Sequence, residues 1–222
     1  MRWVVSRLLN HMSKLIAFTS LLLFLFQGIK AQDHLEPSTS LFGLYDFEYE
    51  YESQIRDTLL KGLSDSPEVQ IVITPSFGKE MVLQLENDRT NQAFTLITQT
   101  GSHSIWYNNY EDKPKEIKIK RIEKELLEDD FKLIKDLYKS AIMTVRYPDE
   151  NIMGLDGTTY QFAVSDYGIK TGQTWSPNEE SRMGRLVDIT HKLVELSEKR
   201  RRSVQLSSEL ISEINKLIIE LQ

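Results

Sequence analysis

The feature that most constrains the fold of this chain is a series of short apolar segments between residues 69 and 122. Each segment is rich in β-branched or aromatic residues, and the separators carry Pro, Gly, Asn or Asp, as the turns of an antiparallel sheet do. Segments with such short connections pair with their neighbours along the chain. The pattern predicts strands at 69–74, 81–86, 94–99, 104–108 and 116–122.

Apolar residues at helical spacing follow these strands. They predict a helix from about Glu128 to Val145, which begins with three acidic residues and ends before Pro148. The spacing returns between 177 and 221 with a break near 199–203. Residues 199–222 are therefore a candidate for a separate C-terminal helix.

Aromatic and acidic residues alternate in the segment 45–52, YDFEYEYE. Period two predicts a strand with its aromatic side chains on one face. Ser53 is also placed to cap a helix that runs to Leu63, in which case the segment begins that helix early. Both alternatives stay open at this point. Before this segment, the polar residues 32–40, which include Pro37, predict a short disordered leader.

The most patterned stretch is residues 155–177, LDGTTYQFAVSDYGIKTGQTWSP, which predicts a β-hairpin. Gly168 is free to adopt the positive φ that many hairpin turns need. Ser176 is placed as the N-cap of the next helix, with Pro177 at its first position and Glu179 completing a capping box. Turn and cap chemistry thus accounts for most residues of this stretch.

Strands, a helix, a hairpin and further helices in this order indicate an α+β fold rather than alternating βαβ units. We expect an antiparallel meander sheet with a central helix, a β-hairpin and C-terminal helices packed on one face. No linker rich in Gly or Ser divides the chain. Residues 41–222 are therefore expected to form a single α+β domain.

Residues 1–31 carry the pattern of a secretory signal peptide. Three basic residues precede or flank the apolar stretch 15–26, and Ala31 stands at the expected cleavage edge. This stretch is too short to cross a bilayer core, which needs a helix of about 20 residues. We therefore expect export to the periplasm or the extracellular space, with no membrane span after cleavage. A signal that begins at Met12 fits the same pattern.

Charge and cysteine content narrow the classes of function. The chain has no Cys, which excludes disulfides, thiolate metal sites and thiol nucleophiles. Cleavage of the signal removes four basic and no acidic residues, so the net charge falls from −6 to −10. An acidic surface repels phosphate backbones, and a nucleic-acid partner is not expected.

No catalytic, metal-binding or cofactor-binding signature stands out in the sequence, and we expect neither a metal nor a cofactor. His103 lies between two serines, but no G-x-S-x-G elbow is present, and neighbours in sequence do not form a triad by themselves. The acidic loop 148–157 departs from a calcium loop, because Met153 and Tyr160 stand where ligands are required.

Five residues are candidates for a ligand-binding surface: Asp156, Tyr160, Trp175, Trp106 and His103. The hairpin places Asp156 and Trp175 at its open end, so the two are expected to lie close in space. An aromatic platform beside a carboxylate suits the binding of a sugar or a peptide. The alternative is that these residues serve only the turns and the core.

A resemblance to known proteins is carried by four segments: PSFGKEMVLQLE, SIWYN, GLDGTTYQF and TGQTWSPNEESRMGRLVDI. Over residues 68–196 the chain resembles a group of uncharacterised exported α+β proteins of Bacteroidetes-type bacteria. The resemblance implies an envelope or secreted location, in keeping with the signal that ends in KAQ. It implies no activity, substrate or catalytic residue.

These observations favour a non-enzymatic exported protein that binds an unknown protein or glycan. One alternative is an envelope hydrolase near the 155–177 hairpin, in which Asp156 and His103 act as acid or base. Another is a protein inhibitor or immunity-like factor, for which a rigid exposed edge and no pocket are expected. The apolar stripe of the last helix is a further candidate contact with a partner, through Leu210, Ile214, Leu217 and Leu221.

Overall fold

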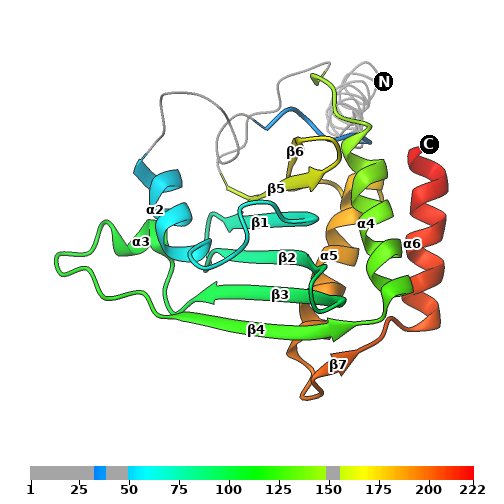
Figure 1. The fold of residues 1–222 in the computed structure, drawn as a ribbon. Helices are drawn as coiled ribbons and strands as arrows, with labels where there is room; N and C mark the ends of the chain where they lie inside the picture. The colour runs from blue at the N-terminus through cyan, green and yellow to red at the C-terminus, as the bar shows by residue number, and fades with distance from the viewer. Residues whose placement is uncertain (1–32, 39–49, 149–155) are drawn as a thin grey trace, which may run out of the picture. The chain divides into compact units, whose positions relative to one another are not determined.

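The computed structural model describes residues 33–38, 50–148 and 156–222 (Figure 1). The predicted signal peptide and most of the acidic loop lie outside these ranges. In chain order the elements are α2 (Glu50–Leu59), β1 (Val69–Pro75), β2 (Met81–Asp88), β3 (Ala93–Gly101), α3 (Ile105–Asn108), β4 (Ile119–Leu126), α4 (Glu128–Ile142), β5 (Thr158–Ser165), β6 (Ile169–Trp175), α5 (Arg182–Glu198), β7 (Ser203–Val204) and α6 (Ser208–Leu221).

The strands of the described residues form one seven-stranded sheet in the order β6-β5-β1-β2-β3-β4-β7. Neighbouring strands are antiparallel except β4 and β7, which run parallel. Strands β1 to β4 form a meander, and the β5–β6 hairpin then adds beside β1, so the first strand lies inside the sheet. The predicted α+β fold is confirmed, with a sheet that is mixed but mostly antiparallel.

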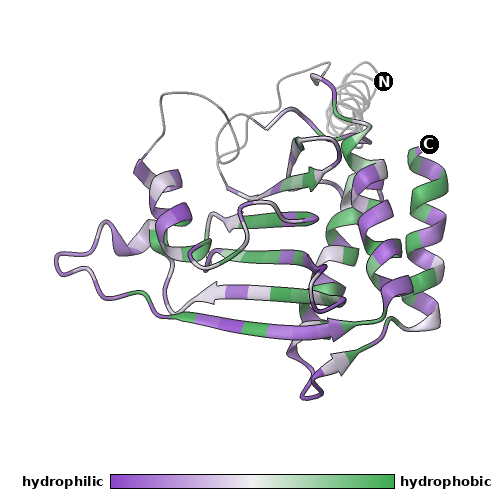
Figure 2. Ribbon diagram, in the orientation of Figure 1, coloured by the Kyte–Doolittle hydropathy of each residue, from purple (hydrophilic) through white to green (hydrophobic). Residues whose placement is uncertain are grey.

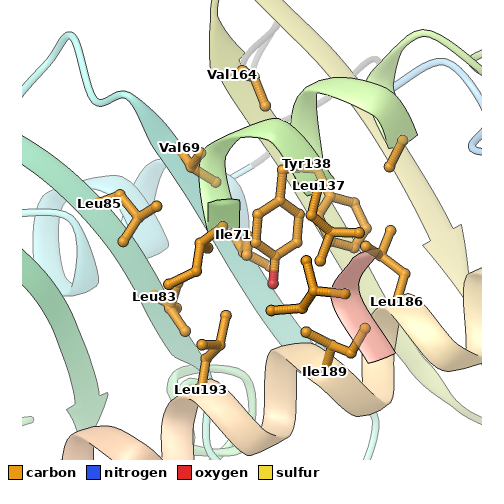
Figure 3. Packing of buried hydrophobic residues seen from close by; sticks show 14 of the residues in the cluster. Val69, Ile71, Leu83, Leu85, Leu137, Tyr138, Val164, Leu186, Ile189 and Leu193 are labelled. Atoms are coloured by element: carbon orange, nitrogen blue, oxygen red, sulfur yellow. The ribbon is translucent and has the colours of Figure 1, made fainter. Parts of the chain in front are cut away.

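The main core lies between one face of the sheet and the helices α4, α5 and α6. Figure 3 shows Ile71 and Leu83 of the central strands directed toward Tyr138 of α4 and Leu193 of α5. These strands are buried on both faces, and alternate residues of each strand point into this core. The one polar group of Tyr138 is satisfied, because its hydroxyl shares a 2.8 Å hydrogen bond with the hydroxyl of Thr190.

The last helix completes this core. It is a separate helix, as predicted, and it packs on both α4 and α5. The prediction of a partner contact through its apolar stripe is wrong, because the protein's own core already buries that stripe. The buried side chains are Leu210, Ile214, Leu217 and Leu221.

The opposite face of the sheet carries a smaller apolar cluster. Ile55 and Leu59 of α2 pack there with Val72, Val82 and Ile105. Figure 2 shows the contrast between strands: β1 is apolar along most of its length, whereas β4 alternates between hydrophilic and apolar residues. The helix α2 and its neighbour α3 therefore cover the face that the three long helices leave open.

The leader predicted at 32–40 is corrected for residues 33–38, which are ordered against the sheet. Leu35 is fully buried in the main core. Glu36 exchanges two backbone hydrogen bonds with Gln173 of β6, at 2.8 and 2.7 Å. A polar composition suggested disorder, but one buried leucine and two backbone pairs are enough to fix the segment.

Of the two alternatives for 45–52, the early helix start is the one observed at Glu50 to Glu52, which belong to α2; the rest of the segment lies outside the described residues. One predicted strand is corrected. Residues 105–108 form the short helix α3 instead of the strand expected at 104–108. The apolar and aromatic composition of this segment resembles a strand, but contacts from distant residues hold it as a helical turn.

The start of α5 differs from the predicted capping box. The N-cap is Ser181, whose hydroxyl oxygen accepts a hydrogen bond from the Gly184 amide at 2.9 Å. Ser176 instead has a φ of +36° and accepts from the Thr158 amide at the open end of the hairpin. Gly184 permits this arrangement, because a Cβ there would lie 1.9 Å from the carbonyl oxygen of Asn178.

Loss of the observed cap should destabilise the domain measurably. Ser181→Ala removes the acceptor for the Gly184 amide, and we expect the free energy of unfolding to fall by about 1 kcal/mol in urea denaturation. Ser208→Ala, at an exposed serine beside another helix start, is the matched control and should change it by less than about 0.5 kcal/mol. Equal effects of the two substitutions would contradict the assignment of the cap.

Candidate functional site

One end of the sheet brings together most of the candidate residues. The antiparallel register pairs Thr74 with Thr159, and Thr159 with Trp175. It also pairs Met81 with Thr100, so the end of β3 and the segment that follows it lie at the same end of the sheet. Residues that are far apart in sequence therefore meet at a common end of the sheet: His103 and Trp106 follow β3, Asp156 precedes β5, and Trp175 ends β6.

Four exposed aromatic side chains lie at this end, and we call them the aromatic surface. Phe77 belongs to the β1–β2 turn, and the other three belong to α3 and the residue pair after it. Their exposed fractions are 73% for Phe77, 42% for Trp106, 44% for Tyr107 and 71% for Tyr110. Large apolar side chains gathered in one exposed place are unusual on a soluble domain and mark sites of interaction.

A buried carboxylate fixes the position of α3. Glu80, at the start of β2, is 1% exposed and accepts four hydrogen bonds. Its Oε2 accepts from the Ile105 amide at 2.7 Å, and its Oε1 accepts from the Trp106 amide at 3.0 Å. The hydroxyls of Tyr51 and Ser104 donate to Oε1 at 2.9 and 3.1 Å. A charge that is this well solvated by donors can be buried.

The same contacts orient the rings. The Trp106 ring meets Tyr51 edge to face, with 5.1 Å between centroids, and lies 5.3 Å from Tyr110. Burial, together with the charge of Glu80, raises the pKa of Tyr51 well above its usual range, so its hydroxyl remains a donor to that carboxylate. Tyr107 is held separately, because its hydroxyl donates to the Ser76 carbonyl at 2.9 Å.

The aromatic surface continues through Ser76 to the hairpin. The Ser76 amide donates to the Gly157 carbonyl at 2.7 Å, and the Gly157 amide donates to the Ser76 hydroxyl at 3.0 Å. A Cβ on Gly157 would lie 2.6 Å from the Trp175 ring, so glycine is required where the indole packs. Asp156, directly before Gly157, is exposed, and Trp175 is half-buried. The two ends of the hairpin do meet.

His103 and Tyr160 take other roles. His103 is exposed, and its Nδ1 lies 2.9 Å from the hydroxyl of Ser102. No hydrogen bond joins His103 to Asp156 in the described part of the chain. Tyr160 is buried on the core face of the sheet, where its hydroxyl shares a 2.8 Å hydrogen bond with Nε2 of His191.

Sequence reasoning missed Glu80, Tyr51 and three of the four rings of the aromatic surface. A signal was present in two places. The segment SIWYNNYE carries three of the rings within five residues, and the turn PSFGKE places a large aromatic residue among turn formers. The carboxylate gave no such signal, because its donors lie 24 to 29 residues away from it along the chain.

Comparisons with family models, curated proteins and solved structures found no match for this chain. Within the described ranges, no group of three or more His, Asp or Glu side chains is placed to hold a metal ion. None of the helices described there has the length and apolar character needed to cross a membrane.

The Glu80 interaction predicts a large cost for a nearly isosteric change. Glu80→Gln removes the charge and turns an amide NH2 toward groups that are themselves donors. We expect the free energy of unfolding to fall by about 3 kcal/mol, measured by urea denaturation. Glu116→Gln, at an exposed position, is the control and should have little effect. A Glu80→Gln variant as stable as the control would contradict the assigned role.

Proposed function

We propose that this protein is an exported, non-enzymatic binding protein whose aromatic surface binds a carbohydrate. The observation that carries the proposal is a group of exposed rings, two of them held by specific contacts: Trp106 by Tyr51, and Tyr107 by the Ser76 carbonyl. Side chains whose orientation is set in advance lose little conformational entropy on binding. Such rings suit recognition better than mobile apolar side chains do.

The surroundings of the rings favour a carbohydrate. The C–H groups of a sugar pack on the electron-rich face of an aromatic ring, while its hydroxyls need donors and acceptors beside that ring. Asn109, Glu111 and Asp112 are exposed next to Tyr110 in sequence, and the side-chain amide of Asn109 donates to Gln54 of α2. Flat apolar groups beside amides and carboxylates match the two-sided chemistry of a sugar.

The charge around the surface disfavours nucleic acid and anionic lipid. Lys113, Lys115 and Lys118 follow α3, but Glu111, Asp112 and Glu116 lie in the same loop and balance them. Lys115 and Glu111 form an ion pair of 3.5 Å. The loop thus has no excess of positive charge, and the whole chain carries −6. Phosphate backbones and anionic headgroups attract basic clusters, which this surface lacks.

Export rests on the N-terminal sequence. The basic and apolar pattern of residues 1–31, the absence of Cys and the resemblance to exported proteins all support an envelope or extracellular location. A carbohydrate ligand is consistent with that location, since glycans are abundant outside the cytoplasm.

The two alternatives have less support. A hydrolase that uses His103 and Asp156 needs the pair assembled, whereas each lies exposed on its own turn. An inhibitor that docks by strand addition needs a free sheet edge. Residues 33–38 pair with β6 at one edge, and at the other edge β7 pairs with only Glu125 and Leu126 of β4, whose exposed charges, such as Lys120 and Arg121, disfavour strand addition. The aromatic surface requires neither arrangement.

Binding of glycans by the purified protein tests the proposal. We expect a glycan array to identify a ligand, and Trp106→Ala to lower the affinity for it at least tenfold in isothermal titration calorimetry. Tyr147→Ala is the matched control, because Tyr147 is an exposed aromatic residue that follows α4 and belongs to neither α3 nor the β1–β2 turn. The proposal fails if no glycan binds, or if both variants bind it equally well.

A further inference from the structure

A second concave site lies on the core side of the same sheet. A cavity of about 530 Å³ is bounded by the start of β5, the loop that begins at Ser176, and the first turns of α5. Cavities of roughly 300–1,000 Å³ are typical of small-molecule sites. Its walls include Tyr160, Pro177, Val187 and His191, none of which belongs to the aromatic surface.

A tyrosine–histidine pair forms one wall of the cavity. Tyr160 is 6% exposed, and its hydroxyl lies 2.8 Å from Nε2 of His191, whose ring stands edge-on to the phenol. Burial raises the pKa of Tyr160, so its hydroxyl stays protonated. The pair thus places a phenol hydroxyl and an imidazole on the cavity wall.

The charged groups around the cavity leave an excess of negative charge. Its cation, Arg185, is neutralised by a two-point ion pair with Glu220, one contact of which is 3.0 Å. Asp188 shares Lys192 with Glu213, at 2.9 and 2.6 Å. Glu179 is exposed at the mouth and has no ion pair among the described residues.

We propose that this cavity binds a small organic cation, with an ammonium group directed to Glu179 and Asp188 and an apolar body against Tyr160, Pro177 and Val187. The negative charge of the two carboxylates favours a cationic ligand over an anionic one. The size of the cavity restricts the ligand to a small molecule. This site is independent of the carbohydrate site proposed for the aromatic surface, and either can fail without the other.

Three probes of one shape and different charge test the proposal: phenethylamine, phenethyl alcohol and 3-phenylpropionate. In isothermal titration calorimetry we expect the amine to bind at least tenfold more tightly than the alcohol, and the acid to show no binding. In NMR, the imidazole signals of His191 should shift during titration with the amine. The proposal is overturned if the amine does not bind, or if the acid binds as tightly as the amine does.

Variants locate the site. Asp188→Asn and Glu179→Gln should each lower the affinity for phenethylamine at least fivefold. Asp136→Asn, which neutralises an exposed carboxylate on α4, should leave it unchanged. Both cavity substitutions are at exposed positions, and circular dichroism establishes that each variant is folded. Equal affinities in all three variants would show that the amine binds elsewhere and would overturn the proposal.

Discussion

The end of the sheet that carries the aromatic surface depends on one buried charge. Isolated in the interior, the carboxylate of Glu80 would cost several kcal/mol, and only the four donors around it make its burial possible. Those donors come from α2 and from the first turn of α3, so the carboxylate ties both helices to β2. Removal of a donor leaves this buried charge with fewer hydrogen bonds, and loss of the Ile105 amide would remove the hydrogen bond to Oε2.

The buried carboxylate of Glu80 also determines where the aromatic surface lies. The amide of Trp106 is one of the donors, and its ring packs on Tyr51, which supplies another. The buried contacts of α3 with Glu80 and Tyr51 thus fix the position of its exposed side chains. The β1–β2 turn and the hairpin then join through paired hydrogen bonds between Ser76 and Gly157, which bring Trp175 and Asp156 to the same end. Rings from segments far apart in sequence become one surface.

The pattern of residues along the sequence predicted those helices and strands that are determined by residues close to one another in the chain. The short apolar segments of β1 to β3, the helical stripe of α4 and the break before α6 all depend on neighbours in sequence. Contacts between distant residues determined the rest. Residues 105–108 have the composition of a strand but are capped from Glu80, and Leu35 lies in a polar segment yet is buried in the core. The pattern of residues along the sequence does not show which distant residues will contact these segments.

The same distinction applies to the candidate sites. The proximity of Asp156 and Trp175 follows from hairpin register, which sequence shows. The link from α3 to this pair is the hydrogen bond from the Tyr107 hydroxyl to the Ser76 carbonyl, and the partner of Tyr160 is His191 on a later helix. Neither link has a sequence motif. Residue types alone identified tryptophans and a tyrosine of interest, but the structure was needed to separate a surface from a cavity.

Amide hydrogen exchange in the wild type and in Glu80→Gln tests most directly whether the buried carboxylate holds the aromatic surface in place. Exchange at Ile105 and Trp106 is the observable, and the amide of Leu83 in the centre of β2 is the internal reference. The account predicts that both α3 amides exchange at least tenfold faster relative to Leu83 in the variant. Unchanged relative rates would show that α3 keeps its position without Glu80 and would contradict the account.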